Sequence, residues 1–171
     1  LGKFLGQSSI IGFATLTGYG IAGLITAFAQ NKMPPISAWI TFVTMIGSAI
    51  LLGACFVALG LFCSAIARHR NSAAGAVVSL WLFFVIIFDL LLLGALISGF
   101  DQIISSEILS AIMLANPADV FRILNMGSLQ GSGLMGGMAE VSSQAQSSFF
   151  TLWVSLLVWC LLPLSATVLI F

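Results

Sequence analysis

Four long stretches of this sequence are apolar and almost free of charge. They span residues 8–29, 36–67, 73–100 and 148–171, and the only charged residue within them is Asp89, in the third. The hydrocarbon core of a bilayer, about 30 Å thick, needs roughly 20 apolar residues in a helix. Because backbone polar groups cannot stay unpaired in lipid, each stretch is predicted to be a membrane-spanning helix rather than a strand.

The composition agrees with a membrane protein. Of the 171 residues, 60% are hydrophobic and 6% are charged, and the mean hydropathy is +1.20. Soluble domains carry about a quarter charged residues, so the sequence predicts an all-α polytopic membrane protein with the lipid bilayer as its surroundings. Five basic residues balance five acidic ones, and this balance gives no reason to expect a nucleic acid partner.

The sequence lacks the short motifs that mark catalysis or nucleotide binding. It has no phosphate-binding glycine loop, no zinc-protease motif and no Cys-x-x-Cys pair, and it contains one histidine. The three cysteines lie in apolar stretches and imply no disulfide framework. We therefore expect no enzyme activity and no cofactor in this chain, and any ATP would be hydrolysed by a separate partner subunit.

Basic residues in the short flanks predict the orientation. Lys3 precedes the first stretch and Arg68 and Arg70 separate the second from the third, whereas Lys32 alone lies between the first and second. Because cytoplasmic loops carry the excess of Lys and Arg, the N-terminal end and the 68–70 connection are predicted to be cytoplasmic. The protein would then lie in a bacterial inner membrane with residues 101–147 in the periplasm.

The segment 101–147 is predicted to begin with two short helices. Ser105 or Ser106 can cap the first, which should end near Ala115. Neither helix is long enough to cross a bilayer, so we expect a re-entrant or a surface-lying pair. The rest of the segment is rich in glycine and is predicted to be an external loop.

Asn116 and Pro117 mark the start of the second short helix. An asparagine caps the first turn well, a proline fits the first helical position, and Asp119 suits the positive end of the helix dipole. This helix is predicted to run through Leu124.

Asp89 lies about midway along the third stretch, where an unpaired carboxylate costs at least about 2.5 kcal/mol. It is either a protonated or hydrogen-bonded residue that fixes helix packing or a residue with a role in transport. Arg122 is placed by the sequence near the middle of the long polar segment, so no basic partner is expected at the depth of Asp89. The predicted partner is a hydroxyl or amide, a helix outside this chain, or a second protomer.

Three methionines, Met126, Met135 and Met138, cluster in and beside the glycine-rich segment. Thioethers are soft ligands that suit Cu(I), and methionine also fills irregular apolar gaps. Two interpretations of these methionines therefore stay open: contact with Cu(I), and packing into apolar gaps.

Three stretches of the sequence resemble ABC-2 permeases. Residues 2–7 resemble the segment that follows the cytoplasmic coupling helix in that family. Residues 88–94 and 116–122 are similar to the ABC-2 permeases that serve the maturation of nitrous oxide reductase. The most specific of these matches is the last, and the residues that we single out in it are Asn116, Pro117, Asp119 and Arg122.

The resemblance implies a type V-like ABC-2 transmembrane domain of which the four visible spans are the third to the sixth. Since the chain begins at Leu1 and stops at Phe171 within an apolar stretch, we expect it to be a fragment whose N-terminal part is missing. The resemblance also implies a permease homodimer, a cytoplasmic ATP-binding subunit and a periplasmic copper-handling protein, with ATP-driven movement serving copper or sulfur handling. Two alternatives stay open: an ABC-2 exporter of a lipid or small amphiphile, and a membrane anchor or assembly factor that transports nothing.

Overall fold

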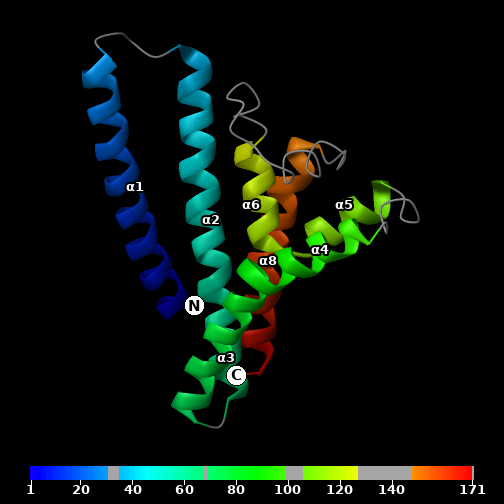
Figure 1. Cartoon of the computed structure of the whole chain (residues 1–171). Coiled ribbons are helices and arrows are strands. Elements are labelled where there is room, and N and C mark those ends of the chain that lie inside the picture. The colour runs from blue at the N-terminus through cyan, green and yellow to red at the C-terminus, as the bar shows by residue number, and fades with distance from the viewer. Residues whose placement is uncertain (31–34, 68, 99–105, 127–147, 171) are drawn as a thin grey trace.

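The computed structural model describes residues 1–30, 35–67, 69–98, 106–126 and 148–170. Within these ranges the chain is helical apart from short connections and contains no strand, which confirms the all-α prediction. The elements are α1 (Gly2–Gln30), α2 (Ile36–Ile66), α3 (Arg70–Leu82), the π-helical segment η1 (Phe83–Ile87), α4 (Phe88–Ile97), α5 (Ser106–Leu114), α6 (Pro117–Met126) and α8 (Phe149–Ile170) (Figure 1).

Four helical stretches are long and apolar enough to cross a membrane, namely Gly2–Phe28, Ile36–Ile66, Asn71–Ala95 and Phe149–Ile170. The third is a composite of α3, η1 and α4, and we refer to it as the third span. Helix α1 begins at Gly2, before the predicted start at residue 8, and so includes Lys3, whose side chain is exposed. A single lysine near a helix end does not stop the helix, because its long stem lets the charge reach the interface.

Helix α2 is the centre of the bundle, since it packs against α1, α3, α6 and α8. The C-terminal end of α1 and the N-terminal end of α2 lie at one end of the molecule, and α2 meets the start of α3 at the other end, the end toward which both termini point (Figure 1). Close approach of α1 and α2 depends on glycine: a Cβ on Gly53 would lie 2.7 Å from Cγ2 of Ile11. Small residues at such contacts let membrane helices pack by van der Waals contact.

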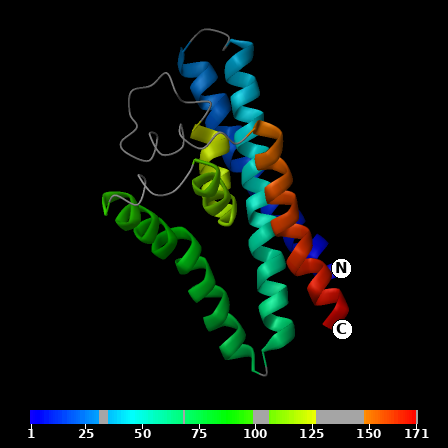
Figure 2. The same cartoon turned by 90° about the vertical axis from the view of Figure 1, so that its right-hand side faces the viewer.

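The third span leans away from α2 and α8, and the α5–α6 pair lies in the space between them (Figure 2). Helix α6 contacts α2, α8 and η1, and α5 contacts α6. The pair is therefore inserted between the spans, which favours the re-entrant arrangement over the surface-lying one. The buried side chains of Leu92 in α4 and of Leu109 and Met113 in α5 pack together and hold α5 on the third span.

The largest apolar core lies where α6 meets α2 and α8. Val120 and Leu156 are completely buried there, and Leu124 is nearly so. The other buried members of this core are Ala54, Cys55, Leu152 and Cys160. Val120 and Leu124 are four residues apart and so lie on one face of α6. This face holds α6 in place and leaves its other side turned toward the third span.

Candidate functional site

The turn between α5 and α6 lies inside the bundle, so its backbone must find partners there. The carbonyl of Leu114, at the end of α5, accepts hydrogen bonds from Ser155 Oγ at 3.2 Å and from Trp159 Nε1 at 3.1 Å, both in α8. Irregular backbone at membrane depth is tolerated only where protein groups or water satisfy it. Two donors on one carbonyl meet that condition and tie the turn to α8.

Asn116 ties the same turn to the third span. Its Oδ1 accepts a hydrogen bond from the backbone N–H of Ala118 at 3.0 Å, and its Nδ2 donates to the carbonyl of Phe84 at 2.8 Å. The first bond is an N-cap, which confirms the predicted start of α6. Pro117 follows as the first helical residue, where its missing N–H has no partner to lose. One buried side chain therefore both starts α6 and fixes it to η1.

The third span changes from α-helical to π-helical bonding over Phe83–Ile87, and this segment ends two residues before Asp89. Within this segment the carbonyls of Phe84 and Val85 accept side-chain hydrogen bonds from α6 and the residue that caps it. Single π turns inside α-helices are often found at functional sites, because they loosen the regular backbone ladder. Here the turn presents two carbonyls to the inserted helix.

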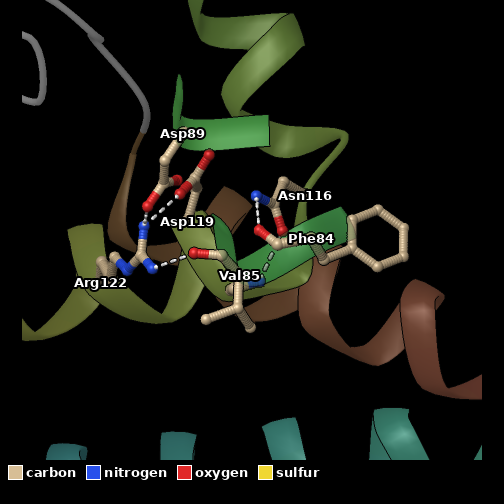
Figure 3. Close-up of polar contacts among 7 residues, drawn as sticks. Phe84, Val85, Asp89, Asn116, Asp119 and Arg122 are labelled. Carbon is tan, nitrogen blue, oxygen red and sulfur yellow. Dashed lines mark hydrogen bonds and ion pairs between the residues drawn. The ribbon is translucent and has the colours of Figure 1, made fainter. Parts of the chain in front are cut away.

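Asp89, Asp119 and Arg122 meet at this turn, and we call these three residues the ionic cluster (Figure 3). The Arg122 guanidinium pairs through Nη1 with Asp89 Oδ2 and, at 3.1 Å, with Asp119 Oδ1. Its Nη2 donates to the Val85 carbonyl at 3.2 Å. A planar guanidinium with five donors suits such shared recognition better than an ammonium would.

The prediction that Asp89 has no basic partner at its depth was wrong. Arg122 stands far from Asp89 along the chain, but α6 turns back between the spans and brings its guanidinium to the carboxylate. Distance along the sequence was a poor guide to depth because a re-entrant pair reverses the path of the chain.

The two carboxyl groups of the ionic cluster differ in burial. The Asp119 side chain is 1% exposed, whereas those of Asp89 and Arg122 are 22% and 28% exposed. Helix α6 is not one of the four spans. Burial, and next the neighbouring Asp89 carboxylate, raise the pKa of Asp119 to about 7, although Arg122 and Asn116 act in the opposite direction. Asp119 thus keeps its proton to a higher pH than an aspartate in water does.

The other residues singled out from the sequence lie elsewhere in the described part of the chain or outside it. Met126 is the last residue of α6, and Met135 and Met138 lie outside the described residues. Arg68 also lies outside them, and Arg70 is the first residue of α3. In the described ranges no group of three or more His, Cys, Asp or Glu could hold a metal ion.

Several contributors had no signal in the sequence. The carbonyls of Phe84 and Val85 accept their hydrogen bonds within the π turn, which no residue pattern predicts. Ser155 and Trp159 belong to an apolar span in which small and aromatic residues are common. The signal that could have paired Arg122 with Asp89 is scarcity, since Asp89 is the only charged residue of the third apolar stretch and Arg122 is the only Lys or Arg after Arg70.

The whole chain, residues 1–171, matches the family model described as ABC-2 family transporter protein. The chain therefore belongs to the ABC-2 transporter family and is a multi-pass membrane permease. Among curated proteins it is 36% identical over 159 residues to the probable ABC transporter permease protein NosY of Pseudomonas aeruginosa. It is 32% identical over 159 residues to the protein of the same name from Stutzerimonas stutzeri. Each alignment covers 93% of this chain and 57% of the relative, so the chain spans less than two thirds of the relatives' length.

Proposed function

We propose that this chain is the membrane subunit through which ATP hydrolysis drives copper or sulfur handling on the periplasmic side, in the maturation of nitrous oxide reductase. Its place in the ABC-2 family and its similarity to two proteins named NosY support this proposal. The ATPase is a separate cytoplasmic subunit, and the protein acts in the bacterial inner membrane with residues 101–147 in the periplasm.

The observation that carries the proposal is the tie between the inserted helix α6 and the third span. Asn116 bonds to η1, and Arg122 bonds to both η1 and Asp89 in α4. A buried charge that loses its partner is costly, so a shift of the third span draws α6 with it. Movement that starts at the cytoplasmic end of the spans can in this way reach the segment beyond α6.

The partners follow from the same role. Many apolar side chains of α1 are exposed, including Ile10, Phe13, Leu24 and Phe28, as suits a helix that meets lipid or another subunit. We propose a permease homodimer that binds a cytoplasmic ATP-binding subunit and a periplasmic copper-handling protein. Copper is cargo in this scheme and belongs to the periplasmic partner.

The test replaces Asp89 with Leu in the full-length permease, expressed with its partner subunits. This change removes the ion pair between α4 and α6 and leaves Arg122 paired with Asp119, so the remaining charges balance. We expect the complex to assemble and ATPase activity to persist, while copper loading of the reductase falls. The matched control is Leu90→Ala, an exposed neighbour in α4, which should load normally.

Two outcomes would contradict the proposal. Normal copper loading with Asp89→Leu would show that the tie between α4 and α6 is dispensable. Failure of the wild-type permease to co-purify with any nucleotide-binding subunit would remove the transporter itself and favour a membrane anchor.

The three methionines are tested separately. We propose that Met126, Met135 and Met138 give at most a weak Cu(I) contact or a docking surface, because no histidine or cysteine accompanies them in the sequence. Replacing all three with Leu keeps the apolar volume and removes the sulfur. We expect normal copper loading, and a clear loss would assign them a direct copper contact.

A further inference from the structure

The ionic cluster holds two carboxyl groups and one guanidinium, so its formal charges do not cancel. The elements around it supply no second cation. In their described residues α2, α8 and η1 carry no charged side chain, and their titratable groups are the cysteines Cys55, Cys63 and Cys160. Helix α5 adds only Glu107, which is exposed and is itself an acid. Among the described residues around the cluster, Arg122 alone offsets the buried Asp119 and the partly buried Asp89.

The hydrogen bonds of the two carboxyl groups are also incomplete. Asp89 Oδ1 and Asp119 Oδ2 are both buried and have no hydrogen-bond partner, although each group uses its other oxygen to bind Arg122. The two side chains point to the same guanidinium from α4 and α6 (Figure 3). An ionised carboxylate can only accept hydrogen bonds, whereas a protonated one can also donate. A single proton on this pair would supply the missing donor and would balance the charge.

We propose that Asp89 and Asp119 together bind one proton, and that this proton holds α6 against the third span. The proton site is a property of the permease chain itself and does not rest on what the transporter handles. The raised pKa of Asp119, about 7, agrees with it.

The direction of the pH effect follows from linkage. When α6 is docked the pKa of Asp119 is raised to about 7 by burial and by the neighbouring carboxylate, whereas an aspartate in water loses its proton at about pH 3.9. The stabilisation of the docked form is therefore complete below the lower value and is lost as the pH rises through the higher one. Alkaline conditions should release α6 from the third span.

Infrared spectroscopy of the full-length permease complex in lipid nanodiscs tests the site directly, because a neutral carboxyl has a carbonyl stretch that a carboxylate lacks. In the wild type we expect one such band to vanish as the pH is raised through about 7. The band should be absent from both Asp89→Asn and Asp119→Asn, since either change leaves one acid paired with Arg122. Glu107→Gln, which removes an exposed acid of α5, is the control and should keep the band.

A wild type without this band would overturn the proposal, and that result needs no variant to fold. A band that survives in either Asn variant would also overturn it, because the proton would then not be shared.

Hydrogen exchange in α6 gives a second readout once intrinsic rates are corrected for. We expect protection in the wild type to fall by up to about tenfold per pH unit above the transition, as release of one proton requires. Protection that does not change with pH in the wild type would contradict a proton-dependent contact.

Discussion

Helix α6 has two sides that are held in different ways. Toward α2 and α8 it packs the buried side chains of Val120 and Leu124 into an apolar core. Toward the third span it relies on Asn116, at its start, and on the ionic cluster. Apolar packing is non-directional and tolerates small shifts of the helix. Each polar bond, by contrast, fixes one geometry, and breaking it leaves an unpaired polar group, which is costly. The apolar side therefore anchors the helix, and the polar side makes its position depend on the third span.

The largest loss of stability should come from the apolar side. Leu156→Ala removes a completely buried side chain from the core beneath α6, and such truncations cost about 2–5 kcal/mol. We expect a marked fall in the temperature at which the purified complex loses its monodisperse state. Leu157→Ala is the control, because Leu157 is the next residue of α8 and is 47% exposed. Equal losses in both variants would show that this core does not anchor α6.

The next effect should come from the centre of the polar side. Arg122→Gln leaves Asp89 and Asp119 without a cation. Removing one partner of a fully buried pair costs about 3–5 kcal/mol, and the partial exposure of Arg122, 28%, should reduce the loss to about 2 kcal/mol. Arg122→Lys keeps the charge but not the planar guanidinium, so its stability should lie between that of the wild type and that of Arg122→Gln. Thermal stability at a fixed pH measures the order, and an unchanged Arg122→Gln protein would show that the cluster contributes nothing.

Asn116→Ala should cost less, about 1–2 kcal/mol, because it removes an N-cap and one bond to the Phe84 carbonyl. The matched variant Asn116→Ser keeps a capping oxygen but is too short to replace the bond to η1. The difference between the two variants therefore separates the cap from the tie to the third span. If the two variants lose stability equally, the cap makes no contribution of its own.

The smallest loss of stability is expected from the hydrogen bonds that α8 donates to the turn between α5 and α6. Ser155→Ala removes one of the two donors to the Leu114 carbonyl, and Trp159 keeps the other. Hydrogen bonds between membrane helices average about 0.6 kcal/mol, so a loss near or below that value is expected in thermal unfolding. A loss as large as that of Leu156→Ala would show that the turn, and not the core, anchors α6.

The fold was largely predictable, because long uncharged apolar stretches leave few options in a bilayer. The start of α6 was also predictable, since asparagine followed by proline carries its own capping chemistry. The pairing of Arg122 with Asp89 was not, because it depends on a chain reversal whose depth no local pattern encodes. The π turn was not predictable either, since the apolar residues of Phe83–Ile87 carry no pattern that distinguishes a π turn from an α-helix.

The π turn also sets the direction in which the rest of the third span faces. A π turn holds one residue more in each hydrogen-bonded ring than an α turn, so the third span accommodates an extra residue within Phe83–Ile87 while the helix continues. If the same residues were wound as a regular α-helix, every residue after the turn would be rotated by up to about 100° around the helix axis relative to α3. Asp89 would then turn away from Arg122. The wide turn thus sets the rotation at which α4 meets α6.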